Sequence, residues 1–228
     1  MSDRAVVLLS GGMDSAVTAA IAKQAHDELF ALTIAYGQRH GIEVERAQAV
    51  ARQLELAEHR VMELDLSAIA RSALTDRSIE VPVDRDHDEI GEGIPSTYVP
   101  ARNTIFLSLA LAWAETLGAS AIYLGANVTD YSGYPDCRPE FIAAFQSLAA
   151  QATQAGVEGA VIRIETPLMR ASKAQIVDLA GRYGVDLGST ISCYRPGPSG
   201  AICGRCDACQ LRAKGFAEAE RVDPSIQH

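Results

Sequence analysis

Residues 5–22 read AVVLLSGGMDSAVTAAIA. The five apolar residues 5–9 are typical of a buried strand, and the small apolar residues 16–22 favour a helix. Between them, Gly11 and Gly12 permit a tight turn in which backbone N–H groups can approach an anion. Because a helix N-terminus attracts negative charge, this order of strand, loop and helix predicts a phosphate-binding loop.

The loop is not a Walker A motif, since the spacing G-x-x-x-x-G-K-[ST] and its lysine are missing. It resembles instead the S-G-G-x-D-S signature of the ATP pyrophosphatases. The resemblance implies that the loop binds the β- and γ-phosphates of ATP, which leave together as pyrophosphate while AMP is transferred. A plain Gly-Gly turn is the alternative, and the ordered six-residue match disfavours it. The candidate ATP contacts are Leu9, Ser10, Gly11, Gly12, Met13, Asp14 and Ser15.

Apolar runs alternate with segments of helical period along most of the chain. Strands are expected at 5–9, 29–35, 59–64, 121–125 and 161–165. Helices are expected at 14–26, 40–55, 103–117, 138–155 and 172–183. This alternation predicts an α/β fold, a doubly wound parallel five-stranded sheet with helices on both faces. The nucleotide should lie at the carboxyl ends of the strands, near the point where the strand order reverses.

Residues 75–100 interrupt this alternation. Three prolines and the charged stretch DRDHDE at 84–89 predict an absence of regular structure there. The segment is either a solvated surface loop or, because loops of this length are uncommon in compact domains, a lid over the active site.

The composition narrows the class of protein. The chain has 228 residues, 48% of them hydrophobic, and a formal net charge of −9. An acidic chain is a poor candidate for wrapping nucleic acid, so no stable nucleic-acid partner is expected. The apolar stretch 105–114 is interrupted by Ser108 and is too short to span a bilayer. With no secretory signal pattern before the first strand, the chain is expected to be cytoplasmic, with no membrane partner.

Four of the five cysteines form the pattern C-x9-C-x2-C-x2-C, at Cys193, Cys203, Cys206 and Cys209. Four thiolates on tight turns suit one tetrahedral Zn²⁺. The competing assignment is an iron–sulfur cluster, whose bacterial run is C-x2-C-x2-C-x3-C-P. Here QLRA follows the last cysteine, without a further Cys or Pro. Zinc is therefore favoured, in a structural role because no coordination position is left open.

The cysteine pattern also suggests a boundary. Residues 1–190 are expected to form the nucleotide-binding α/β domain, and residues 191–228 a small zinc-binding appendage that ends in a helix at 207–221. The fifth cysteine, Cys137, has no C-x2-C partner. A metal role is not expected for it, and a role as nucleophile is a minority interpretation.

Several motifs together resemble the 7-cyano-7-deazaguanine synthase family, whose product is a precursor of the tRNA nucleoside queuosine. The similarity runs essentially end to end, and the block at 130–141 with the terminal cysteines is its most particular part. The motifs are LSGGMDS at 9–15, YGQRH at 36–40, VPARN at 99–103, DYSGYPDCRPEF at 130–141, TPL at 166–168 with Lys173 after it, and SCY…CGRCDAC at 192–209.

The resemblance implies an ATP-dependent ligase that converts 7-carboxy-7-deazaguanine and ammonia to the nitrile through adenylated intermediates. It also implies Mg²⁺ on the phosphates and a homodimer. Asp14, Ser15 and Lys173 are the candidate catalytic residues, with Asp14 a direct or water-mediated ligand of Mg²⁺. For Lys173 an exposed lysine in the first turn of a helix is an equal alternative on sequence grounds.

Substrate recognition has several candidates. Arg102 or Arg138 could pair with the substrate carboxylate, and Asp136 or Glu140 could accept hydrogen bonds from the guanine-like N–H edge. Alternatively, residues 138–140 simply open a helix, with proline in the first turn. Tyr131 and Tyr134 could stack on the base, and His40 is either a ligand contact or a surface histidine. The candidate substrate-binding residues are Arg102, Asn103, Tyr131, Asp136, Arg138 and Glu140.

Two other functions compete with the ligase. One is a tRNA-thiolating ATP pyrophosphatase, which the acidic charge and the absence of an appended RNA-binding domain disfavour. The other is a zinc-ribbon nucleic-acid-binding module. Around the cysteines, however, basic and acidic residues are mixed: Arg195, Arg205, Arg212 and Lys214 with Asp207, Glu218 and Glu220. Since there is no room for a glutaminase domain, ammonia should be free or delivered by a partner.

Overall fold

The computed structural model describes residues 3–39, 41–90, 92–128, 133–197 and 200–226. Within them, five strands form one parallel sheet in the order β3-β2-β1-β4-β5. The strands are β1 Arg4–Leu8, β2 Glu28–Ala35, β3 Glu58–Glu63, β4 Ala121–Tyr123 and β5 Arg163–Glu165. The predicted α/β fold with a five-stranded parallel sheet is confirmed, and each predicted strand end lies within two residues of the observed one.

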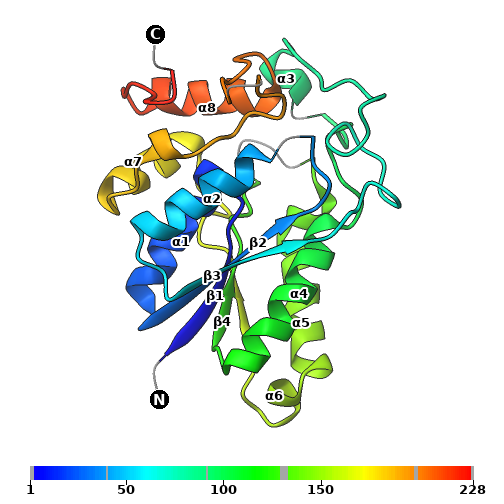
Figure 1. Cartoon of the computed structure of the whole chain (residues 1–228), viewed down its shortest axis with the longest axis vertical. Coiled ribbons are helices and arrows are strands. Elements are labelled where there is room, and N and C mark those ends of the chain that lie inside the picture. The colour runs from blue at the N-terminus through cyan, green and yellow to red at the C-terminus, as the bar shows by residue number, and fades with distance from the viewer. Residues whose placement is uncertain (1–2, 40, 91, 129–132, 198–199, 227–228) are drawn as a thin grey trace.

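Helices cover both faces of the sheet (Figure 1). On one face lie α1 Met13–Ala25, α2 Ile42–Gln53 and α7 Lys173–Arg182, and on the other lie α4 Arg102–Leu117 and α5 Pro139–Ala152. Successive residues of a strand point to opposite faces. Val6 and Leu8 therefore pack with α4 and α5, whereas Ala5 and Val7 pack with α1. Among the described residues, no helix has both the length and the apolar character that crossing a membrane requires.

Two predicted helices end differently in the structure. The single helix expected at 138–155 is divided at Thr153, whose extended backbone separates α5 from the short α6 Gln154–Val157. The Thr153 hydroxyl accepts a hydrogen bond from Gly156 N at 3.0 Å, so this threonine caps α6 instead of continuing α5. The last helix, α8 Asp207–Glu218, stops before the predicted residue 221, and Glu220 has a φ of 53°.

The segment 75–100 is not devoid of regular structure, so that prediction was wrong. It contains the one-turn helix α3 His87–Ile90 and an isolated antiparallel bridge between Val83 and Cys206. Asp84 N donates to Arg205 O at 2.9 Å, and the Arg85 guanidinium forms an ion pair with Asp207. These contacts bind the segment to the cysteine-rich end of the chain, where Figure 1 shows α3 beside α8.

The strand order reverses at β1, which lies between β2 and β4. The connections that follow β1 and β4 therefore meet at the carboxyl edge of the sheet, a position where doubly wound folds bind ligands. They approach closely, since a Cβ at Gly125, just after β4, would lie 3.0 Å from Ser15 N at the start of α1. Only a glycine fits this crossing without displacing the loop.

Candidate functional site

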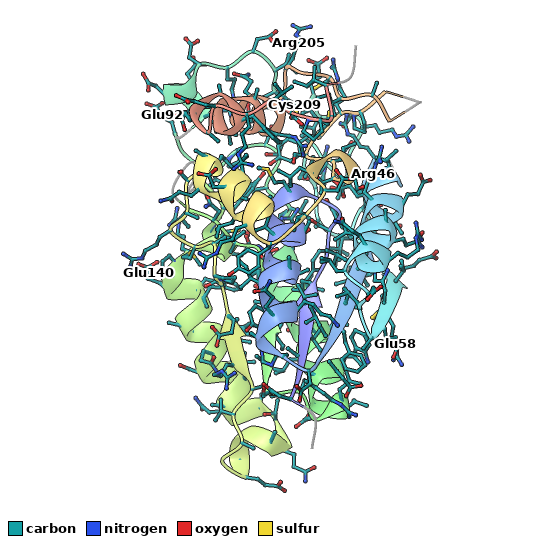
Figure 2. All side chains as sticks on the ribbon, turned by 90° about the vertical axis from the view of Figure 1, so that its left-hand side faces the viewer. Arg46, Glu58, Glu92, Glu140, Arg205 and Cys209 are labelled. Carbon is teal, nitrogen blue, oxygen red and sulfur yellow. The ribbon has the colours of Figure 1, made fainter. Side chains whose placement is uncertain are left out.

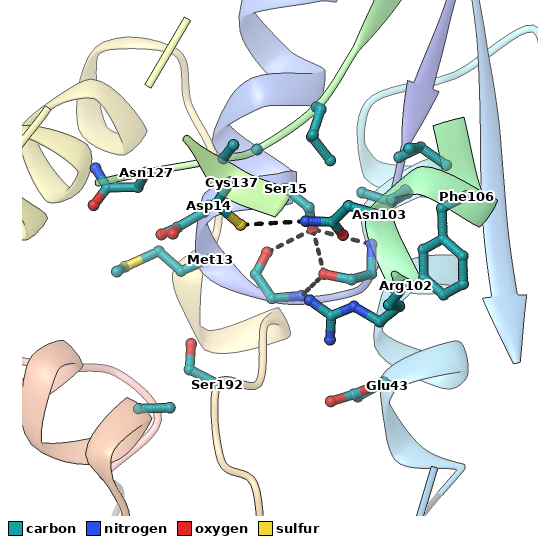
Figure 3. A pocket seen from close by; sticks show the side chains of 18 of the residues that line it. Met13, Asp14, Ser15, Glu43, Arg102, Asn103, Phe106, Asn127, Cys137 and Ser192 are labelled. Atoms are coloured by element: carbon teal, nitrogen blue, oxygen red, sulfur yellow. Dashed lines mark hydrogen bonds between the residues drawn. The ribbon is translucent and has the colours of Figure 1, made fainter. Parts of the chain in front are cut away.

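A cavity of about 290 Å³ opens at this carboxyl edge, where the fold was predicted to bind a nucleotide. Its walls come from the loop after β1, the N-termini of α2 and α4, the residues after β4, and the chain on either side of Cys193. Figure 3 shows Asp14 and Asn127 on one side of this space and Arg102, Glu43 and Phe106 on the other. The cavity thus has a phosphate-loop end and an arginine–glutamate end.

The phosphate-loop end is ordered by hydroxyl hydrogen bonds. Ser10 N and Ser10 Oγ both donate to Ser15 Oγ, at 3.1 and 3.0 Å, and Ser15 Oγ donates to Gly12 O at 2.9 Å. Gly12 is the N-cap residue of α1, and no side chain caps this end of the helix. The N-terminal N–H groups of α1 therefore face the cavity in the arrangement that binds anions at other helix N-termini.

The two glycines of the loop have different structural roles. Gly11 has a φ of +79°, and a Cβ on it would lie 2.3 Å from Glu43 O and 2.8 Å from Ala47 N. A Cβ on Gly12 would meet nothing closer than 3.4 Å, and Gly12 lines the cavity. Gly11 thus allows the loop to pack against α2, while Gly12 leaves space in the cavity for a ligand.

Lys173 reaches the same loop from the start of α7. Its Nζ lies 2.5 Å from Asp14 Oδ2, and its side chain is only 15% exposed. Ser172 and Gln175 form a reciprocal capping box that fixes this helix end. The alternative of a solvent-exposed first-turn lysine is therefore not what the structure has.

At the other end of the cavity, Arg102 and Glu43 face the same space (Figure 3). The Arg102 guanidinium lies 5.7 Å from the centre of the Tyr36 ring. In the described part of the chain no carboxylate lies within ion-pair distance of Arg102. Arginine stays charged in proteins, so this end carries a cation that an anionic ligand can neutralise.

Glu43 was not among the sequence candidates. Burial raises its pKa from the ordinary 4.5 to about 7, and nearby Arg102 acts in the opposite direction. The sequence feature that could have identified this residue was its position three residues after the YGQRH motif. Reading that stretch only as a helix start left no chemical role for the side chain.

Asn103 and Asp136 are bonded to each other. Asn103 N donates to Asp136 Oδ2 at 2.9 Å, and Asn103 Nδ2 donates to Asp136 O at 3.0 Å and to Cys137 Sγ at 3.2 Å. The buried Asp136 carboxylate therefore satisfies the N-terminus of α4 and is not part of the cavity lining, whereas Asn103 and Cys137 are. Before Asp136 could contact a substrate, its hydrogen bond with Asn103 N would have to break.

The remaining substrate candidates lie apart from the cavity or outside the described residues. Arg138 and Glu140 are exposed at the beginning of α5, where Pro139 occupies the first turn. Figure 2 shows Glu140 projecting outward from the molecule. This geometry matches the helix-opening alternative for both. Tyr131 and His40 lie outside the described residues, whereas Tyr134 lines the cavity.

The four C-terminal cysteines come together as their spacing predicts. Their Sγ atoms all lie within 4.8 Å of one another. A tetrahedral ion with Zn–S bonds of about 2.3 Å would hold its sulfurs about 3.8 Å apart. Backbone N–H groups donate to these sulfurs, from Tyr194 to Cys206 at 3.4 Å and from Cys203 to Cys193 at 3.2 Å. The donor set therefore fits a metal ion bound by thiolates.

Cys137 is separate from that cluster. Burial raises the pKa of its thiol to about 11, so it is neutral near pH 7. A neutral thiol is a weak nucleophile, which counts against the minority interpretation of Cys137.

The cysteine segment also supplies part of the cavity wall. Tyr194 follows Cys193 directly, and its hydroxyl lies 3.2 Å from that of Tyr134. The Tyr134 hydroxyl lies 2.8 Å from Thr97 Oγ1, in the segment 75–100. Residues far apart in sequence are thus joined by hydroxyl contacts beside the cavity.

Comparison with known proteins gives consistent matches. Residues 4–220 match the family model described as "Queuosine biosynthesis protein QueC". The chain is 54% identical to the 7-cyano-7-deazaguanine synthase of Saccharophagus degradans, over 97% of this chain and 96% of that protein. It is 56% identical to that of Stenotrophomonas maltophilia, over 98% of each. The structure of NMN synthetase from Francisella tularensis superposes with a TM-score of 0.51 at 15% identity, covering 97% of this chain and 79% of that one, a similarity of fold.

Proposed function

The chain belongs to the QueC family of queuosine biosynthesis proteins, and from this premise we propose that it converts 7-carboxy-7-deazaguanine and ammonia to 7-cyano-7-deazaguanine at the expense of ATP. The observation that carries the proposal is a cavity in which a phosphate loop of the ATP pyrophosphatase type faces Arg102, which has no carboxylate within ion-pair distance among the described residues. The relatives' name, 7-cyano-7-deazaguanine synthase, supports the product.

The reaction needs a leaving group, because a carboxylate can expel only oxide. In the proposed sequence, a substrate carboxylate oxygen attacks the α-phosphorus of ATP, and pyrophosphate leaves. Ammonia then displaces AMP from the acyl adenylate and gives the amide. The amide oxygen attacks the α-phosphorus of a second ATP, pyrophosphate leaves again, and loss of AMP and two protons from that adduct gives the nitrile. The chain contributes positioning and charge stabilisation.

The loop residues hold the departing pyrophosphate in this proposal. The N–H groups at the start of α1 and the hydroxyls of Ser10 and Ser15 are the neutral donors, and Lys173 is the cation. Mg²⁺, when bound, would neutralise phosphate charge, and the Asp14 carboxylate would hold it. Lys173 then exchanges its contact with Asp14 for one with a phosphate oxygen.

Cys193, Cys203, Cys206 and Cys209 are proposed to hold one structural Zn²⁺, which leaves no open coordination position. The chain is proposed to divide at residue 190 into a nucleotide-binding domain and this metal-binding appendage. The two parts pack closely, since a Cβ on Gly215 of α8 would lie 2.5 Å from Lys173 Cβ.

We also propose an oligomeric state, a compartment and a source of ammonia. A homodimer in the cytoplasm is our assignment, and the five cysteines without a disulfide suit a reducing compartment. Ammonia arrives free or from a partner, and the net charge of −9 argues against a stable nucleic-acid complex. The tRNA-thiolating alternative is not favoured, because the relatives that match nearly the whole chain carry the synthase name.

Mass spectrometry of the products tests this function. Purified protein is incubated with 7-carboxy-7-deazaguanine, ATP, Mg²⁺ and ammonium, and in parallel with tRNA and a sulfur donor. We expect the nitrile in the first incubation and unchanged tRNA in the second. Thiolated tRNA without any nitrile would replace the proposed function by the alternative.

A further inference from the structure

Two acidic side chains line the cavity among the described residues, Asp14 and Glu43. Asp14 is paired with Lys173 at the phosphate-loop end. The acids that the sequence suggested for the guanine-like edge are placed elsewhere, since Asp136 caps α4 and Glu140 is exposed on α5. Glu43 is therefore the acid in the cavity that has no role in the proposed phosphate chemistry.

The position of Glu43 is firmly set by the fold. It lies in the first turn of α2, and its backbone oxygen is in contact range of Gly11 in the phosphate loop. Its side chain lies at the same end of the cavity as Arg102 and Phe106 (Figure 3), and Tyr36 lines the cavity as well. In the part of the chain that the structure describes, its carboxyl group has no hydrogen-bond or ion-pair partner. A half-buried acid that lines a cavity in this way is complementary to a donor on a ligand.

The substrate offers such donors. A guanine-like base presents N1–H and the 2-amino group side by side, and a carboxylate accepts both in parallel. Building on the proposed function, we infer that Glu43 is the specificity residue that reads the N1–H and 2-amino edge.

Adenine would make the opposite demand on this acid. Its edge has an acceptor nitrogen beside an amino group, so it pairs best with a protonated carboxylic acid. The guanine-like edge pairs with the ionised form, and its binding should strengthen as pH rises through the Glu43 pKa of about 7. Arg102 stays cationic, and burial raises the pKa of Tyr36 to about 12 and that of Tyr134 above its usual range. Asp14 and Lys173 face the opposite end.

The test compares Glu43→Gln with Glu45→Gln, an exposed acid on the same helix. Two ligands are used, 7-carboxy-7-deazaguanine and its analogue without the 2-amino group. Binding of each is measured by calorimetry with α,β-methylene-ATP present, so the result does not depend on turnover. The wild type should prefer the amino compound by roughly 10- to 100-fold, the value of hydrogen bonds to a charged group. Glu43→Gln should lose this preference, and Glu45→Gln should retain it.

Two further readouts separate this assignment from a structural effect. The wild-type preference should grow between pH 6 and pH 8, and the KM for ATP should stay unchanged in Glu43→Gln, provided that its melting curve shows a folded protein. If that variant does not fold, the pH profile of the wild-type preference decides alone. An unchanged preference in Glu43→Gln, a flat pH profile, or a change confined to ATP would overturn the inference. The nitrile assay is separate, so nitrile formation with an unchanged preference would contradict only the role of Glu43.

Discussion

Lys173 Nζ and Asp14 Oδ2 lie 2.5 Å apart, although 159 positions separate the two residues in the sequence. The contact joins the N-termini of α7 and α1 at the phosphate-loop end of the cavity. A cation and a carboxylate held together there can separate when phosphates and Mg²⁺ enter, each taking an oppositely charged partner. This pair is the basis of the first prediction.

Lys173→Met should lower kcat by roughly 100- to 1,000-fold, the usual loss when one group that stabilises developing charge is removed. The fold should survive, because the capping box at Ser172 and Gln175 does not involve the lysine side chain. Steady-state kinetics and thermal melting measure the two effects. Lys214→Met, which removes an exposed lysine on α8, is the control and should keep wild-type kcat.

Asp14→Ala should abolish turnover, and Ser10→Ala should reduce it, with little change in melting temperature. Both side chains line the cavity and neither belongs to the apolar core. Near-normal nitrile formation by either variant would show that its side chain does not act on the phosphates.

The two loop glycines should respond differently to alanine. Gly11→Ala should lower the free energy of unfolding by roughly 2–4 kcal/mol, because it combines a positive φ with overlap on the Glu43 backbone. Gly12→Ala should melt near the wild-type temperature but bind ATP more weakly, since its Cβ occupies ligand space. Chemical denaturation and calorimetry give the two values. Equal stability of the two variants would contradict the packing role of Gly11.

Glu43 should make stability depend on pH. Its pKa is raised from 4.5 to about 7 in the folded chain, and it returns to the ordinary value on unfolding. The unfolded state therefore ionises first, and the native state loses stability as pH rises from 4.5 to 7. Glu43→Gln should melt above the wild type at pH 8, and the difference should vanish near pH 4. A difference independent of pH would mean that ionisation is not its cause.

The cysteine cluster should bind one Zn²⁺ per chain, and the purified protein should be colourless because zinc is d¹⁰. Cys206→Ser should lose the ion and destabilise the C-terminal segment, whereas Cys137→Ser should keep the full metal content. Elemental analysis and X-ray absorption, with Zn–S near about 2.3 Å, check this. Iron with acid-labile sulfide would instead identify the cluster that the sequence left as the alternative.

The fold and the phosphate loop could be predicted because their signals are local. The apolar runs and helical periods of a doubly wound sheet are visible in short windows, and the loop is six consecutive residues. The four cysteines of the cluster also lie in one segment, so their spacing is visible in the sequence. Errors occurred where a local residue had two possible roles, as at Thr153, which caps α6 instead of continuing α5.

The substrate end of the cavity could not be predicted in the same way. It is assembled from Glu43 on α2, Arg102 on α4 and Tyr194 beside the cysteines, so tertiary packing alone brings these residues together. Asp136 illustrates the difficulty. The motif predicts an acid near the site, but the sequence does not tell whether its carboxylate binds a ligand or caps a helix N-terminus. Only the bond to Asn103 N distinguishes the two.

Oxygen transfer from substrate to nucleotide tests the central claim of adenylation most directly. 7-Carboxy-7-deazaguanine labelled with ¹⁸O in both carboxylate oxygens is converted in the presence of ATP, Mg²⁺ and ammonium, and the nucleotides are analysed by mass spectrometry. If each carboxylate oxygen leaves in a molecule of AMP, every nitrile formed should be accompanied by two molecules of AMP that each carry one ¹⁸O. Formation of ADP, with ¹⁸O in inorganic phosphate and none in AMP, would show γ-phosphoryl transfer and contradict the adenylate mechanism.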